Sequence, residues 1–258
     1  MYDPPAYLWV ITIAGPAAVA AVTCTVLYGG AEDAGLGRRR AALLAGAAAV
    51  VLGGWLIASA VIASHGWYHT LPWFPVAVTG YLGLLLALCR IPAVARALAA
   101  PGMVSRLGLP HTPRAAGAVF LLYLALGRLP ALFALPAGLG DIAAGIAAPL
   151  VARRLAQGTG RRGALWFNAF GMTDLVVAVA LGALTGFHLL NVTPPSVPIT
   201  ELPLALIPTA TVPLLLALHI TSMFTLVRVP RPAPSAAGQL IAGGMSGHSG
   251  HLPSMNNP

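Results

Sequence analysis

Residues 128–174 read RLPALFALPAGLGDIAAGIAAPLVARRLAQGTGRRGALWFNAFGMTD, and this stretch decides the fold. Two apolar runs flank the basic segment RRLAQGTGRR, which is the pattern of two membrane crossings joined by a short loop. The stretch also contains Arg128, Asp141 and Asp174, the three charges that we expect to lie deepest in the hydrocarbon. Because an ionisable group at such a depth is costly, these residues are the natural candidates for function.

The whole chain has the composition of an integral membrane protein. Of its 258 residues, 58% are hydrophobic and only 8% are charged, whereas soluble domains contain about 25% charged residues. Basic residues outnumber acidic ones by 14 to 6, but they stand in short clusters between long apolar runs. This arrangement is typical of membrane topology rather than of phosphate binding, so we expect a lipid bilayer and no nucleic acid as partner.

The apolar runs predict an all-α, polytopic protein, with a seven-transmembrane-helix bundle over residues 1–230. Each run approaches the roughly 20 residues that a hydrocarbon core of about 30 Å requires. The predicted crossings cover residues 7–29, 41–64, 71–89, 115–133, 137–152, 164–188 and 203–227. The fourth and fifth are short and need a tight turn around Pro136; one crossing plus a re-entrant segment is the alternative. Residues 231–258, rich in Pro, Gly and Ser, are predicted to be a disordered cytoplasmic tail.

Arginines supply the predicted orientation. They follow the first, third, fifth and seventh crossings, and Arg128 is the one exception. By the positive-inside rule, the N-terminus lies outside and the C-terminus lies in the cytoplasm, which fits the inner (plasma) membrane of a bacterium. After the third crossing, residues 90–98 form an apolar face with Arg90 and Arg96 elsewhere, which predicts an amphipathic helix on the inner membrane surface. These arginines either anchor that helix or bind an anionic lipid or partner selectively.

Depth along the helices brings several polar residues to similar levels. A rise of about 1.5 Å per residue places Asp141 and Asp174 roughly 18 Å from the cytoplasmic arginines, and Arg128 roughly 21 Å from them. His219 lies roughly 14 Å deep on the last crossing, and Asn168 shares a face with Asp174. Both acids lie among small residues, which mark the faces where membrane helices pack closely. The sequence therefore predicts a central polar site of Asp141, Asp174, Arg128, His219 and Asn168.

This central site has two interpretations. Two acids near one arginine cannot both be ionised cheaply, so one could take up a proton or cation as the bundle changes shape, as in a proton-coupled carrier. Alternatively, Arg128 pairs permanently with Asp141, while Asp174 hydrogen-bonds Asn168 or a helix end and only fixes packing. The sequence leaves both interpretations open.

A second group of polar residues is predicted at the outer surface. His65 and His69 are four residues apart, and with His188 they could form a metal site. The neighbouring Trp67 and Trp73 instead indicate an aromatic belt at the lipid headgroups, where histidine is also common.

Three segments resemble a family of uncharacterised, multi-pass (about seven-helix) bacterial integral membrane proteins. The segments are FALPAGLGDIAAGIAAPLVA, WFNAFGMTDLVVAVALG and LPLALIPTATVPLLLALHITSM, within residues 129–223. The family carries D-I-x-x-G-x-x-A-P, a W-N pair and a closing helix with prolines and a histidine. Here the matching positions are Asp141 to Pro149, Trp166 and Asn168 with one residue inserted, and Pro208, Pro213 and His219. The resemblance implies the fold and carries no activity with it.

Function is therefore open between three classes. The sequence has no motif of a nucleotide hydrolase, serine hydrolase or zinc protease, so an enzyme is the less expected outcome and any cofactor is unknown. The first hypothesis is a carrier for a small solute or ion, with coupling to protons as one option. The alternatives are a non-catalytic subunit or assembly factor that binds a membrane protein partner, and an intramembrane metal-, haem- or lipid-cofactor-binding protein.

Overall fold

The computed structural model describes residues 4–228, most of which are helical and none of which is in a strand. Residues up to Leu226 form one compact unit, and a second unit begins at Val227. Five helices are each long and apolar enough to cross a membrane: α1 (Ala6–Asp33), α2 (Arg38–Ser64), α7 (Ala131–Ala156), α8 (Arg161–Gly186) and the stretch Ile207–Arg228, formed by the π-helical η4 (Ile207–Thr211) and α9 (Val212–Arg228). The chain is therefore an integral membrane protein.

Another span is counted if two neighbouring helices are taken together. These are α3 (Trp73–Leu88) and α4 (Pro92–Leu98), which are bent by 85° at the turn between them. By length and composition, residues 4–228 thus contain five spans, or six with this pair. α4 is the short helix predicted within residues 90–98, and it turns sharply away from α3; its position on the membrane surface stays a prediction.

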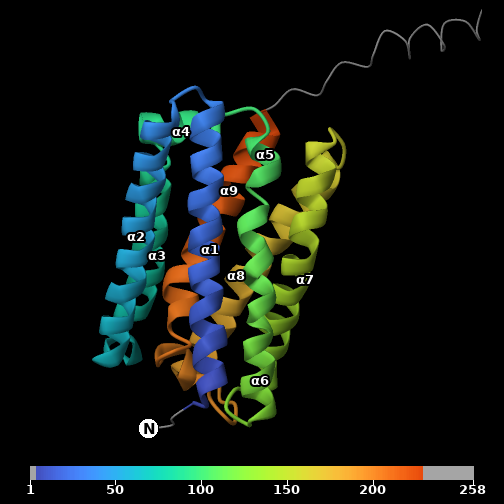
Figure 1. Ribbon diagram of the computed structural model, residues 1–258. Coiled ribbons are helices and arrows are strands. Elements are labelled where there is room, and N and C mark those ends of the chain that lie inside the picture. Colours follow the sequence, from blue (N-terminus) through green and yellow to red (C-terminus); the bar gives the residue numbers. More distant parts are fainter. Residues whose placement is uncertain (1–3, 229–258) are drawn as a thin grey trace, which may run out of the picture. The chain divides into compact units, whose positions relative to one another are not determined.

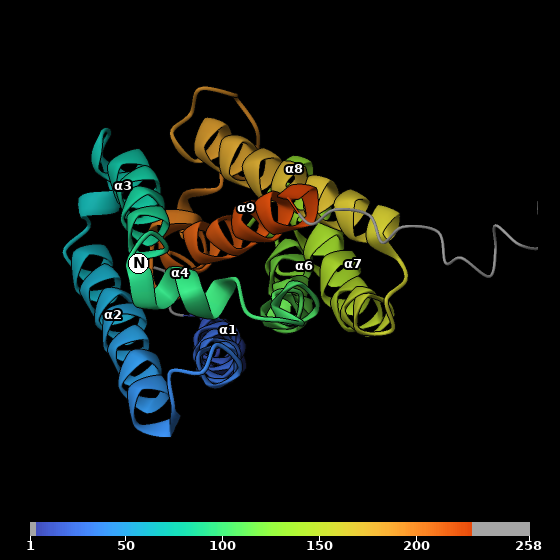
Figure 2. The same ribbon diagram turned by 90° about the horizontal axis from the view of Figure 1, so that it is seen from above.

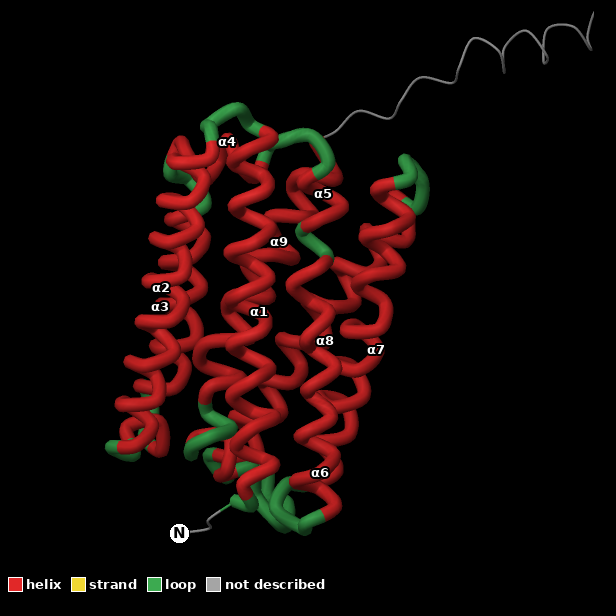
Figure 3. The backbone as a smooth tube through the Cα atoms, in the orientation of Figure 1, coloured by secondary structure: helices red, strands yellow, loops and turns green. Residues whose placement is uncertain are grey.

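The remaining helical elements are short and lie between the long ones. They are η1 (Trp67–His69), α5 (Met103–Arg106), η2 (Leu109–Ala118), α6 (Val119–Ala125) and η3 (Val197–Thr200). Figure 3 shows that loops gather at the two ends of the long helices. The predicted tail, residues 231–258, lies outside the described residues.

Within the first unit, α1 stands between two groups of helices. It packs against α2 on one side and against η2 on the other, and η2 packs in turn against α7 (Figure 1). In the orientation of Figure 1, α8 and α9 lie behind η2 and α7, as the view from above shows (Figure 2). This arrangement places η2, which is not itself a long helix, among α1, α7 and α9.

The predicted fourth and fifth crossings have different boundaries in the structure. Residues 109–118 are a 3₁₀ helix, and Pro113 within it lacks the N–H group that an α-helix would use there. The following α-helix ends at Ala125, not at residue 133, and the turn after it uses Gly127 at φ +66°. α7 then begins at Ala131 and continues through Pro136, so the turn expected at Pro136 is wrong.

Apolar side chains cover the outside of the long helices. α2 has only four buried residues over its 27, and Leu43, Val50 and Ile57 are among its exposed side chains. A soluble protein rarely exposes so large an apolar surface, whereas lipid tails cover it without cost.

Candidate functional site

A buried arginine, Arg114 on η2, lies at the centre of a polar cluster inside the helices. Its side chain is 1% exposed. The Nε atom donates to Asp141 Oδ1 of α7 at 2.8 Å, and Nη2 donates to Asp174 Oδ2 of α8 at 2.5 Å. One guanidinium therefore joins three segments through charge-assisted hydrogen bonds, the stronger class of protein hydrogen bond.

Asn168 and His219 extend the cluster toward α9. Asn168 Nδ2 donates to the carbonyl oxygen of Ala164 at 2.8 Å and to Ser222 Oγ at 3.1 Å, so its Oδ1 faces the other way. Oδ1 lies 2.9 Å from His219 Nδ1, which must carry the proton because an amide oxygen only accepts. His219 Nε2 then presents its lone pair to Arg114 Nη1 at 3.4 Å. In this arrangement His219 is neutral and adds no positive charge.

Three glycines make room for the polar side chains of this cluster. Each lacks a Cβ at a point where a neighbouring side chain passes, and a Cβ there would overlap the Asp141 carboxylate at Gly117, the Asp174 carboxylate at Gly140 and the His219 ring at Gly171. These glycines thus accommodate the polar side chains of the cluster as well as close helix packing.

A second histidine, His111 on η2, lies against the cluster. It is 1% exposed, and its ring stacks on that of His219 with centroids 3.8 Å apart. Phe167 meets both rings, edge-on to His111 at 5.6 Å. His111 Nδ1 is buried without a hydrogen-bond partner among the described residues, so a polar group remains unsatisfied one ring away from Arg114.

Two small cavities flank Asp141. One of about 30 Å³ is lined by Arg114 and Asp141 together with Pro16 and Leu215, and another of about 20 Å³ lies between Asp141 and Phe133. A cavity needs about 10–15 Å³ to hold a water molecule, so each has space for one or two waters and neither has space for an organic solute.

The structure brings together four of the five residues predicted for the central site: Asp141, Asp174, His219 and Asn168. The prediction for Arg128 is wrong. Arg128 lies in the exposed turn between α6 and α7, because α6 ends at Ala125 and does not carry the chain deep at residue 128. The arginine of the cluster is Arg114, which in the sequence is one of the arginines between the third and fourth predicted crossings.

His111 is a further residue of the cluster that is absent from the predicted site. The signal that could have found both residues is LPHTPR, residues 109–114, where two prolines favour a 3₁₀ turn. In a 3₁₀ helix, side chains three residues apart lie on one face, so His111 and Arg114 point the same way. That face meets α7 and α9, which supply Asp141 and His219.

The three outer histidines do not form a metal site. No group of three His, Cys, Asp or Glu side chains that could hold a metal ion occurs within residues 4–228. His65 Nδ1 lies 2.8 Å from the carbonyl oxygen of Val61, and His188 is exposed. His69 instead lies beside Thr200 and Glu201, at 2.9 and 3.9 Å. His65 and His69 therefore have separate local partners.

The long apolar helices and the buried ionic cluster define an integral membrane protein with a charged interior. The model of a domain of unknown function, DUF8737, matches residues 71–227, and the chain belongs to that family. The matched region contains every residue of the cluster, and the expected resemblance to an uncharacterised family is confirmed. No curated protein and no solved structure matches the chain.

Proposed function

We propose that this protein is a proton-coupled carrier of a small solute or ion in the bacterial inner membrane, and that its cluster of Asp141, Arg114 and Asp174 binds the coupling proton. The observation that supports the proposal is the sharing of one guanidinium by the carboxylates of buried Asp141 and part-buried Asp174, whose side chains are 13% and 9% exposed. With both carboxylates ionised, the cluster carries one uncompensated negative charge, because His219 is neutral. A proton on either carboxylate removes that charge.

The charge balance favours a functional over a purely structural role. A buried ion pair is tolerated when the charges compensate each other, whereas an extra charge in hydrocarbon is expensive. A cluster that only fixed packing would need one carboxylate for its arginine. The second carboxylate makes the arrangement sensitive to protonation.

Protonation at this place would reach several helices at once. Arg114 lies on η2, its two carboxylates on α7 and α8, and its histidine contact on α9. A proton on Asp174 or Asp141 weakens one of these contacts, so the helices can separate more easily. A solute larger than water requires such a separation, since the cavities beside Asp141 are small.

The proposed topology has seven crossings, with η2 and α6 together as the fourth. η2 and α6 follow one another alongside α7 (Figure 1). The arginines at the starts of α2 and α8 and in α4 then lie in the cytoplasm, and the turn at Arg128 lies outside.

Infrared spectroscopy of the purified protein tests proton binding without knowledge of the solute. In a titration between about pH 5 and pH 9, we expect the carbonyl band of a protonated, buried carboxylic acid to be present at low pH and to disappear as the pH rises. Asp174→Asn or Asp141→Asn should remove the pH-dependent band, while Asp33→Asn, at the exposed end of α1, should retain it. A wild-type protein with no such band would rule out proton coupling at this cluster.

Flux in proteoliposomes tests the carrier itself. A pH-sensitive dye inside the vesicles reports proton movement when a panel of ions and small organic solutes is added outside. Asp174→Asn should insert normally but abolish the proton movement seen with wild type. Normal flux in both Asp141→Asn and Asp174→Asn would refute the role of the cluster.

A further inference from the structure

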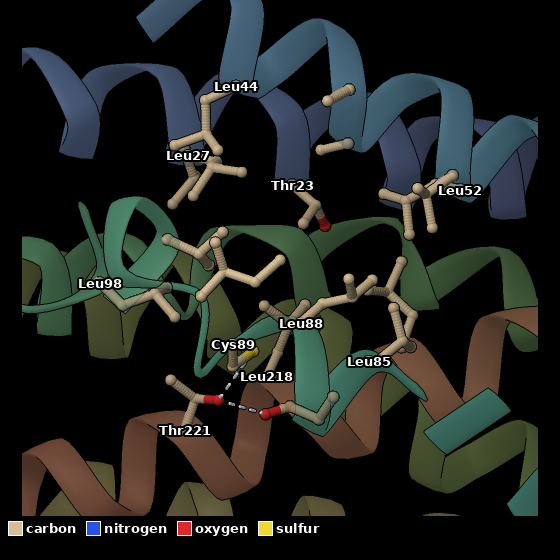
Figure 4. A pocket seen from close by; sticks show the side chains of 18 of the residues that line it. Thr23, Leu27, Leu44, Leu52, Leu85, Leu88, Cys89, Leu98, Leu218 and Thr221 are labelled. Carbon is tan, nitrogen blue, oxygen red and sulfur yellow. Dashed lines mark hydrogen bonds between the residues drawn. The ribbon is translucent and has the colours of Figure 1, made fainter. Parts of the chain in front are cut away.

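A third, larger and almost entirely apolar cavity lies away from the ionic cluster. It measures about 190 Å³, larger than the engineered cavity of about 150 Å³ that binds benzene. Side chains from α1, α2, α3, α4 and α9 line it, among them Leu27, Leu44, Leu85, Leu98 and Leu218 (Figure 4). The occupant must therefore be a hydrophobic group of several carbon atoms.

The two hydroxyl groups that line the cavity donate their hydrogen bonds elsewhere. Thr23 and Thr221 both line it, but each hydroxyl donates to its own helix, at 2.7 Å from the carbonyl oxygens of Val19 and Ala217. Figure 4 shows the second of these bonds, and Cys89 beside it. A polar solute would lose hydrogen bonds with water and gain none here, so the cavity selects hydrocarbon.

The cavity lies next to the arginine-rich end of the helices, where α2 begins and α3 ends. On α2, the lining residues Leu44 and Leu52 follow Arg40 by roughly 6 and 18 Å, so the cavity occupies about one leaflet of the hydrocarbon. Ile91 lines the cavity and directly follows Arg90.

That end carries a surplus of positive charge. Glu32 and Asp33 of α1 pair with Arg38 and Arg106, at 3.5 and 2.6 Å. Within residues 4–228, no carboxylate pairs with four exposed arginines of the same end: Arg39, Arg40, Arg90 and Arg96. This surplus attracts an anionic group at the membrane surface.

We infer that the cavity holds one acyl chain of an anionic phospholipid, whose headgroup phosphate lies among these arginines. An amphiphile of this kind satisfies both observations, hydrocarbon in the cavity and negative charge at its arginine-rich end. A partner helix does not fit, because a helix with its side chains is about 10 Å across and far exceeds the cavity volume. This site is separate from the cluster at Arg114 and does not depend on the carrier proposal.

Photolabelling of the wild-type protein tests the inference directly. The probe is a phosphatidylglycerol with a photoreactive diazirine in one acyl chain, and the protein is placed in lipid nanodiscs. We expect label on Leu218 or its neighbours, because Leu218 is buried in the bundle and only a chain inside the cavity reaches it. Label confined to outward-facing residues such as Val50 and Ile57 would overturn the inference.

Matched variants separate the chain from the headgroup. Ala48→Phe fills the cavity and should reduce label on Leu218 to background, whereas Ala49→Phe, on the exposed side of α2, should leave it unchanged. Equal labelling in both variants would contradict occupancy of the cavity. If Ala48→Phe fails to fold, labelling of the wild type still decides the matter.

The headgroup is tested by competition with unlabelled lipids. Phosphatidylglycerol should displace the probe better than phosphatidylcholine with the same chains. Arg90→Gln and Arg96→Gln should each lower this preference for phosphatidylglycerol about fivefold. The control pair Arg153→Gln and Arg154→Gln, at the end of α7, should keep it. Equal competition by the two lipids, or competition by a free fatty acid alone, would contradict the inference.

Discussion

Arg114 supplies the positive charge for two buried carboxylates, so its removal should be the most damaging single change in the cluster. Asp141 and Asp174, whose side chains are 13% and 9% exposed in the native protein, lose their cation in Arg114→Gln. Removing one partner from a buried ion pair typically costs about 3–5 kcal/mol. We therefore expect a large loss of stability, measured as unfolding of the detergent-solubilised protein by tryptophan fluorescence.

Arg128 provides the control for this variant. It carries the same charge in an exposed turn, where ionic contacts are worth about 1 kcal/mol or less. Arg128→Gln should unfold close to the wild type. Equal losses in the two variants would show that Arg114 does not carry the charge of the cluster.

At the scale of single helices, α8 depends on a glycine to pass close to α9. A Cβ at Gly171 would overlap the His219 ring, which holds Asn168 and faces Arg114. Gly171→Ala should therefore displace His219 and destabilise the protein by about 1–3 kcal/mol, the usual cost of overpacking. The same fluorescence measurement detects this loss.

Gly163 offers a matched control on the same helix. A Cβ at Gly163 meets nothing within 4 Å, so Gly163→Ala should be neutral or slightly stabilising, given the higher helix propensity of alanine. A Gly171→Ala protein as stable as Gly163→Ala would mean that His219 tolerates displacement, and that the close approach of α8 and α9 is not required.

The elements differ in how well the sequence predicts them. α1, α2, α8 and α9 follow from long apolar runs ended by arginines, because hydrocarbon demands about 20 apolar residues in one helix. The same criterion fails for η2, which contains two prolines and several polar residues and whose buried face packs against α1 and α7. Hydropathy identifies helices whose side chains face lipid, and it does not identify a segment whose functional side chains face other helices.

The candidate site shows the same division. Asp141, Asp174, Asn168 and His219 lie within apolar runs, so depth along a helix brings them to one region. Arg114 precedes its apolar run and resembles any loop arginine in sequence. Only the packing of η2 between α1 and α7 shows that it is buried.

At the scale of the whole molecule, α9 belongs to two separate environments. His219 and Ser222 join the polar cluster with α8, while Leu218 and Thr221 line the apolar cavity with α1 to α4. Neighbouring residues of a helix point about 100° apart, so one helix can serve both sides. A movement of α9 would therefore change the ionic cluster and the lipid cavity together.

The proposed topology makes a prediction about which turns can be reached from each side of the membrane. Single cysteines are placed at four exposed positions, Arg39, Arg153, Arg128 and Leu189, in a protein whose Cys24 and Cys89 are replaced by alanine. A membrane-impermeant maleimide applied to intact cells should label the cysteines at 128 and 189. Those at 39 and 153 should react only after the cells are opened.

Position 128 is the decisive one, because it tests whether η2 and α6 cross the membrane. If they cross, the turn between α6 and α7 lies on the opposite side from Arg39 and Arg153, and all seven segments alternate in direction. If the cysteine at 128 reacts only after the cells are opened, the segment 109–125 enters and leaves on one side. Arg114 would then approach its two carboxylates from a re-entrant segment, and the arginine-rich end would no longer determine the orientation of α7 and α8.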